Sequence, residues 1–209
     1  MKQKQHKKLW VSALCLGLAI TLILQATLLA QDCYEIRQNL LRLHLLANSD
    51  SPQDQALKLK VRDALLAYGN TLFPPTATKE EAIALTQNNL QEIERIAEKT
   101  LQKEGCSYPV TCCLDTAYFT TRVYDSVTLP AGTYTALRVV IGQGKGQNWW
   151  CVMFPPLCIP SAADLTTTPK TLENSLSQNQ QTLVENGVKY QAKFKVVEWF
   201  QNLKNKWFS

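Results

Sequence analysis

The sequence has few of the side chains from which metal and nucleophile sites are built. Its 209 residues include two histidines, His6 and His44, and its seven cysteines show no CxxC spacing and no Cys/His pairing of the zinc type. We therefore expect no metal ion and no cofactor. Nine prolines and eight glycines are ordinary numbers, which excludes collagen-like and low-complexity chains.

Acidic residues are missing from the amino-terminal part of the chain. None precedes Asp32, whereas Lys2, Lys4, Lys7 and Lys8 all lie within the first eight residues. The formal net charge is +5, but the chain from Asp32 onward contains 18 of the 22 basic residues and all 17 acidic ones, a net charge of +1. That nearly neutral remainder lacks the basic surface needed to bind duplex nucleic acid, so we exclude nucleic acid as a partner.

An uncharged apolar run, LWVSALCLGLAITLILQATLLA, follows the lysines at residues 9–30. As a helix it would be about 33 Å long, enough to cross a bilayer core. Lysines before such a run are typical of an export signal, and the positive-inside rule places the rest of the chain outside the cytoplasm. Residues 1–31 are thus a signal peptide or a membrane anchor. Ala30 suits a cleavage site but Leu28 does not, so both fates stay open.

Export changes how the cysteines are interpreted, because disulfides form outside the cytoplasm. Cys151 and Cys158 lie seven residues apart across Pro155 and Pro156. A disulfide between them would stabilise the fold by about 2.5 kcal/mol. The alternatives are inert thiols, or a Cys151 nucleophile with His44 as its base. Spacing does not decide the pairing of the other exported cysteines, which are Cys33, Cys106, Cys112 and Cys113.

Residues 32–160 carry mixed helical and strand patterns. They predict an α+β domain in which two helices pack on a mainly antiparallel sheet. Ser51 and Pro52 begin the first helix, and a capping box from Thr78 to Glu81 begins a longer one that ends at Gly105. Strands are expected at residues 41–47, 108–114, 117–124, 134–141 and 148–154.

Two further segments follow this domain. Residues 161–187 are rich in Thr, Gln, Asn and Ser and indicate a polar linker. Residues 188–209 predict a basic amphipathic helix, since Val196, Phe200, Leu203 and Trp207 share one face. That helix would lie on a membrane surface, bind a partner or dock on its own domain.

Two short stretches are candidates for contact with another molecule. Helix capping accounts for Ser51 but does not require Asn48 and Ser49. Trp149 and Trp150 are adjacent, so on a strand one faces inward and the other outward. Residues 142–146, GQGKG, are not a phosphate loop, because a strand rather than a helix follows them; they predict a glycine-rich hairpin.

Two long segments resemble the stage II sporulation protein R family. They are residues 41–63, LRLHLLANSDSPQDQALKLKVRD, and residues 129–158, LPAGTYTALRVVIGQGKGQNWWCVMFPPLC. The resemblance spans about residues 40–159. It implies a non-enzymatic protein that is exported across the forespore membrane into the intermembrane space. There it would activate a membrane-embedded aspartic peptidase, which then cleaves pro-sigma-E.

Within that role, the expected partner-binding residues are Asn48, Ser49, Asp50, Trp149 and Trp150, and no residue is expected to be catalytic. Two other classes of function remain open. One is an exported thiol-dependent hydrolase that uses Cys151 and His44. The other is a septal structural protein that binds membrane or wall through its terminal helix.

Overall fold

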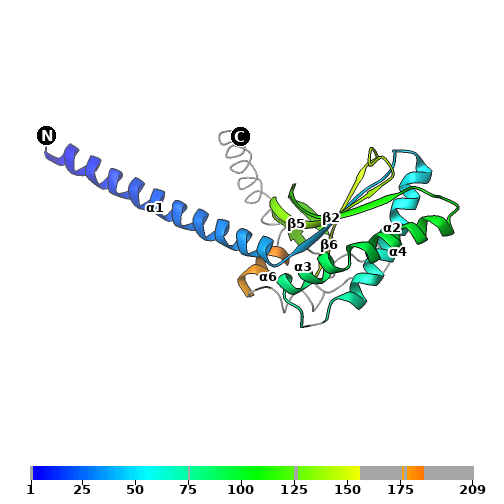
Figure 1. Cartoon of the computed structure of the whole chain (residues 1–209). Helices are drawn as coiled ribbons and strands as arrows, with labels where there is room; N and C mark the ends of the chain where they lie inside the picture. Colours follow the sequence, from blue (N-terminus) through cyan, green and yellow to red (C-terminus); the bar gives the residue numbers. More distant parts are fainter. Residues whose placement is uncertain (1, 75, 125–126, 156–175, 177, 186–209) are drawn as a thin grey trace. The chain divides into compact units, whose positions relative to one another are not determined.

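The chain divides into two compact units, residues 1–35 and 36–209. The computed structural model (Figure 1) describes residues 2–74, 76–124, 127–155, 176 and 178–185. The predicted amphipathic helix at 188–209 and most of the predicted linker at 161–187 lie outside the described residues.

The first unit is helical. Helix α1, Lys2–Gln38, contains a stretch from Trp10 onward that is long and apolar enough to cross a membrane. From Trp10 to Leu28 its apolar side chains are exposed; Trp10 is 77% exposed and Leu14 76% exposed. Side chains of this kind are stable in lipid rather than in water. Helix α1 is therefore a candidate membrane anchor or signal sequence, as predicted.

The second unit is built on a four-stranded sheet with the strand order β2-β5-β1-β6. Strand β1 runs parallel to β5 and antiparallel to β6, and β2 runs antiparallel to β5. Two of the three pairings are antiparallel, so the predicted mainly antiparallel sheet is confirmed. The strands are β1 Leu41–Leu46, β2 Val110–Phe119, β5 Gly132–Ile141 and β6 Asn148–Phe154.

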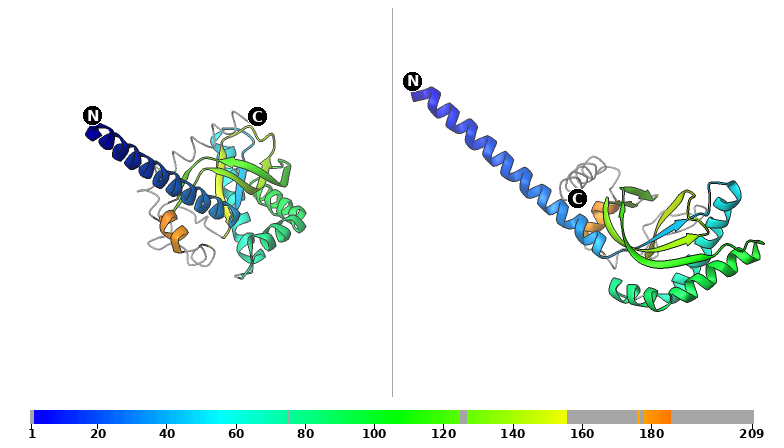
Figure 2. Two further views of the ribbon diagram at one scale, coloured as in Figure 1. Left: turned by 90° about the vertical axis from the view of Figure 1, so that its left-hand side faces the viewer. Right: turned by 45° about the horizontal axis from the view of Figure 1, so that its top comes forward.

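Three helices cover one face of this sheet (Figures 1 and 2). Helix α2, Pro52–Leu72, begins at Ser51, whose hydroxyl accepts the backbone N–H of Asp54 at 3.1 Å. Helix α3, Lys79–Asn88, begins with the predicted capping box between Thr78 and Glu81. Helix α4, Leu90–Lys103, is followed by Gly105 in the left-handed conformation, with φ +74°.

The longer helix that the sequence predicts is broken in two at Asn89. The Asn89 side chain donates to the Leu85 carbonyl at 2.8 Å and accepts from the Tyr68 hydroxyl at 3.2 Å. A short amide side chain that bonds nearby backbone offers the chain an alternative to the helical ladder. The break therefore has a local cause, and the α+β class is unchanged.

Strand alternation places the core between the sheet and the helices. Leu41, Leu43 and Leu45 point toward the helices and are fully buried, whereas Arg42 and His44 point to the opposite face. Helices α2 and α4 contribute apolar residues at helical spacing. These buried residues are Leu57, Val61, Leu65, Ile93, Ala97 and Leu101.

The second unit also contains a small two-stranded sheet and a short helix. Strands β3, Arg122–Tyr124, and β4, Val127–Leu129, form a two-stranded antiparallel sheet. Strand β2 is longer than predicted and ends at Phe119, so the expected strand at 117–124 is divided between β2 and β3. Helix α6, Gln178–Glu185, lies within the predicted linker, contacts β4 and buries Leu183 and Val184.

Candidate functional site

The glycine-rich segment, residues 142–147, crosses the carboxyl end of β1. Strands β5 and β6 are not neighbours, because β1 lies between them. The segment is therefore a crossing loop, and the predicted hairpin between adjacent strands is wrong. The sequence pattern shows where each strand ends but not which strand lies between them. We call residues 142–147 the glycine loop.

The loop between β1 and α2 forms hydrogen bonds with the backbone of the glycine loop. The Asn48 side-chain oxygen accepts the backbone N–H of Gln143 at 3.0 Å, and the Asp50 carboxylate accepts that of Gln147 at 2.6 Å. The carbonyls of Ala47 and Asn48 accept two further N–H groups of the glycine loop at 2.9 and 3.2 Å. We call residues 47–50 the clasp.

Helix α2 anchors the clasp in turn. The Asp54 carboxylate is buried and accepts from Asn48 Nδ2 at 2.8 Å and from the Ser49 hydroxyl at 2.5 Å. These hydrogen bonds, first that of Ser49, lower the pKa of Asp54. Lys58, also buried, donates to the Gln147 carbonyl at 2.8 Å and to the Gln55 amide oxygen at 2.6 Å. Burial lowers the pKa of Lys58.

Close approach explains the glycines. Gly142 and Gly144 have φ values of +57° and +62°, where a side chain would be strained. A Cβ atom on Gly142 would collide with the Asn48 side chain, and one on Gly146 with the Ser49 carbonyl oxygen. The two family-like segments are thus interlocked: the clasp lies in the first and the glycine loop in the second.

The two tryptophans lie on opposite faces of the sheet, as the alternation predicts. Trp149 packs against the helix side, with the Arg62 guanidinium carbon 4.5 Å from the ring centroid. Trp150 stacks on His44 with ring centroids 3.6 Å apart and planes 12° apart. The five predicted contact residues are therefore divided among the clasp and two faces of the sheet, and their role in binding stays a prediction.

The sheet face away from the helices carries a cluster of one arginine and aromatic side chains that was not predicted from the sequence. Arg42 is fully buried, donates through Nε to the Cys151 carbonyl at 2.8 Å and lies 4.3 Å from the centroid of the Phe119 ring. It also lies 5.0 Å from the Tyr134 ring centroid. The signal was the alternation in LRLHLL, which places an arginine on a strand between buried leucines.

The geometry does not support a Cys151 and His44 dyad. In the pairing of β1 with β6, Cys151 is opposite Leu43 and Trp150 is opposite His44, so the thiol and the ring point to opposite faces. Cys151 is also bonded in a disulfide. Its predicted partner, Cys158, lies outside the described residues. Free thiols are found at Cys15, Cys106, Cys112 and Cys113, and Cys33 also keeps its thiol.

No other arrangement in the described part of the chain indicates a reaction centre. Within those residues, no group of three or more His, Cys, Asp or Glu side chains is placed to hold a metal ion. An open hollow of about 240 Å³ lies between the end of α4 and the start of β2. Its lining residues, among them Glu98, Gln102 and Tyr108, include no nucleophile paired with a base. The clasp and the glycine loop remain the candidate site.

Comparison with known proteins identifies a family. Residues 37–164, which include the clasp and the glycine loop, match the family described as Stage II sporulation protein R (spore_II_R). The protein named Stage II sporulation protein R in Bacillus subtilis (strain 168) is 35% identical over 180 residues, a match that covers 78% of this chain and 80% of that protein. No solved structure matches. The chain belongs to the stage II sporulation protein R family.

Proposed function

We propose that the chain is an exported signalling protein of endospore formation. In this proposal it activates a membrane-embedded aspartic peptidase, and that peptidase then cleaves pro-sigma-E. Membership in a sporulation family is the observation that carries the proposal. The apolar helix α1 supports export across the forespore membrane into the intermembrane space. The chain would act there either anchored through residues 9–30 or released by cleavage.

The proposed mechanism is selective binding. An activator shifts its partner only if it binds the active state more tightly than the resting one. Moving that equilibrium from 1:99 to 99:1 requires a preference of about 10⁴-fold. Such discrimination favours a surface whose shape is fixed before contact. The clasp and the glycine loop fit this requirement, because four hydrogen bonds hold the loop backbone on the clasp.

A non-enzymatic role agrees with the chemistry of the described residues. The hydrolase alternative needs the Cys151 thiolate next to His44. Cys151 is instead in a disulfide, and the two side chains point to opposite faces of the sheet. We therefore propose that the chain has no catalytic residue.

Complementation tests the proposed function. The full chain is produced in the forespore of sporulating cells that lack their own stage II sporulation protein R, and cleavage of pro-sigma-E is followed by immunoblot. We expect the unaltered chain to restore cleavage. A Cys151→Ser, His44→Ala double variant that accumulates and resists protease should restore it too. Its failure would revive the hydrolase. An exported, folded chain that never restores cleavage would instead favour a structural role at the septum.

A further inference from the structure

Glycine and long polar residues alternate in the glycine loop. A side chain at any of the three glycines would point inward and collide with a neighbour. The neighbours are Asn48 at Gly142, Val140 at Gly144 and Ser49 at Gly146. The residues that follow the glycines, Gln143, Lys145 and Gln147, are exposed. The crossing over β1 explains the inward glycines, but it places no demand on the outward row. That row needs an explanation of its own.

None of the three exposed side chains makes a hydrogen bond or ion pair within the described part of the chain. Gln143 and Gln147 take part there only through backbone groups, and Lys145 only through its backbone N–H. Lys58 and Lys60 differ in this respect, because Lys58 donates to two oxygens and Lys60 pairs with Glu104 at 2.5 Å. Two amides and an ammonium group therefore project from a backbone that is itself tightly held.

This combination resembles a prepared contact surface more than an ordinary solvated loop. Ordering a flexible loop at an interface opposes binding, and a loop that is already ordered avoids that penalty. Loops positioned by a rigid scaffold carry much of the binding function of proteins. Here the scaffold is the carboxyl end of β1 and β5 together with the start of α2.

We propose that the glycine loop is the part of the chain that contacts the activated partner, through Gln143, Lys145 and Gln147. Asn48 and Asp50 are then positioning residues that hold the loop in shape. This inference rests on the proposed function and narrows its site. It replaces direct contact by Asn48 and Asp50 with an indirect role.

The chemistry of the row indicates the class of partner. An amide side chain both donates and accepts, and so matches the N–H and C=O groups of an extended backbone. An ammonium group matches a carboxylate. The complementary surface is therefore a polypeptide segment of the partner that offers backbone N–H and C=O groups and at least one acidic side chain.

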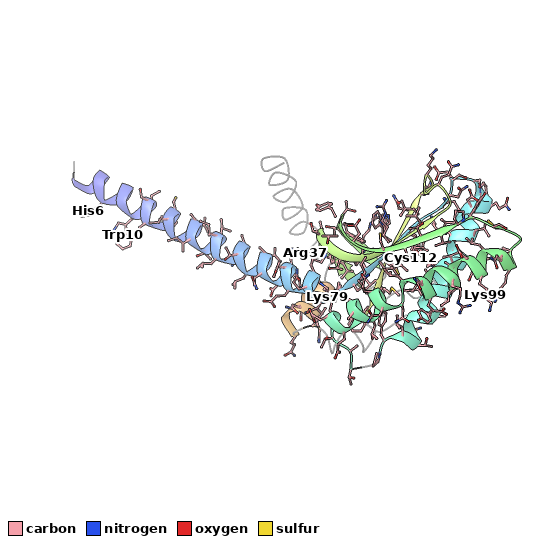
Figure 3. The ribbon with its side chains drawn as sticks, in the orientation of Figure 1. His6, Trp10, Arg37, Lys79, Lys99 and Cys112 are labelled. Carbon is pink, nitrogen blue, oxygen red and sulfur yellow. The ribbon has the colours of Figure 1, made fainter. Side chains whose placement is uncertain are left out.

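The test uses the full chain in the complementation assay. The loop variant is Gln143→Ala, Lys145→Ala, Gln147→Ala, which leaves every glycine in place. The matched control is Gln91→Ala, Lys99→Ala, Gln102→Ala, which removes the same side-chain types from the exposed face of α4; Figure 3 labels Lys99 there. Both purified variants are also examined by thermal unfolding.

We expect the loop variant to lower pro-sigma-E cleavage at least about tenfold, equivalent to about 1.4 kcal/mol of lost binding. Its melting temperature should match that of the control, which should cleave normally. Lys145→Arg should retain cleavage and Lys145→Glu should lose it; this pair decides the matter if the triple variant is unstable. Normal cleavage by both the loop variant and Lys145→Glu would overturn the loop's role and leave the proposed function standing. Failure of the unaltered chain would overturn the proposed function, and the loop's role with it.

Discussion

Asn48 joins the two segments that carry the family resemblance. Its side-chain oxygen accepts from the glycine loop, and its side-chain nitrogen donates to Asp54 on α2. An amide can do both because it carries an acceptor and two donors on one short side chain. A carboxylate of the same size would keep the first contact and repel Asp54. The identity of this residue is therefore fixed by its two neighbours.

Replacing Asn48 should destabilise the domain measurably. Asn48→Ala removes a donor from the buried Asp54 carboxylate, which should lower the unfolding free energy by about 1–3 kcal/mol, whereas water can replace Asn48 at the exposed Gln143 N–H. Asn70→Ala, at an exposed position of α2, is the matched control and should have little effect. Chemical denaturation of the two purified variants measures the difference. Equal midpoints for both would show that the clasp contributes nothing to stability.

His44 should make stability depend on pH. Burial lowers the pKa of His44 from its ordinary 6.5, an effect opposed in part by its contact with Asn148. The unfolded chain then takes up this proton at a higher pH than the folded chain. The unfolding free energy should therefore be constant well above pH 6.5 and fall as the pH drops below it.

His44→Phe tests this dependence because phenylalanine retains a ring to stack on Trp150 but does not titrate. Between about pH 7.5 and 5.5 the variant should show a smaller fall in unfolding free energy than the unaltered chain. Denaturant titrations at several pH values supply the comparison. Parallel slopes would assign the pH dependence to other groups.

At the scale of elements, local signals were predictable and non-local pairings were not. Ser51, Pro52 and the Thr78 capping box mark helix starts through contacts within a few residues, and the structure confirms them. The insertion of β1 between β5 and β6 joins residues about a hundred positions apart. No short pattern encodes that order. The crossing loop and the cluster around Arg42 were not predicted for the same reason, because both depend on pairing between distant residues.

Strand β2 is an edge of the sheet that α4 partly protects. Glu94 accepts the backbone N–H of Cys112 at 2.7 Å, and Glu98 accepts that of Val110 at 3.4 Å. Unpaired edge groups are templates for pairing with another chain. Carboxylates from a packed helix therefore take the place of a further strand at this end of β2. Figure 3 labels Cys112 on this strand.

Removing that protection should weaken the domain. Glu94→Ala leaves a partly buried N–H without its acceptor and should lower the unfolding free energy by about 1–3 kcal/mol. Glu94→Gln keeps an acceptor and should have a smaller effect. Gln91→Ala on the same helix is the control. The denaturation midpoints of the three variants rank their stabilities. Light scattering detects any self-association. A Glu94→Ala midpoint equal to that of the control would contradict edge protection.

Across the whole molecule, charge and apolarity are divided between the two units. The first unit carries four lysines before an exposed apolar helix, and the second holds the clasp, the glycine loop and a mixed set of 18 basic and 15 acidic residues. The sequence predicted this division because composition needs no knowledge of pairing. It named Asn48, Ser49 and Asp50 of the clasp as contact residues, whose role in binding stays a prediction, and it did not include the glycine loop among them. It did not predict which residues there point outward, since that depends on what lies beneath them.

The amino-terminal lysines should decide the side of the membrane on which the second unit lies, and Cys113 offers a reporter. Cys113 is an exposed free thiol, whereas Cys112 beside it is buried and burial raises its pKa to about 12. When the chain is produced in growing cells, where an exported domain faces the medium, a membrane-impermeant maleimide added to the intact cells should label the unaltered chain. A variant with glutamine at Lys2, Lys4, Lys7 and Lys8 should be labelled much less until the cells are permeabilised, because the topological signal is lost. Cys113→Ser sets the background from other thiols. Equal labelling of the lysine variant in intact cells would show that the apolar run alone directs export.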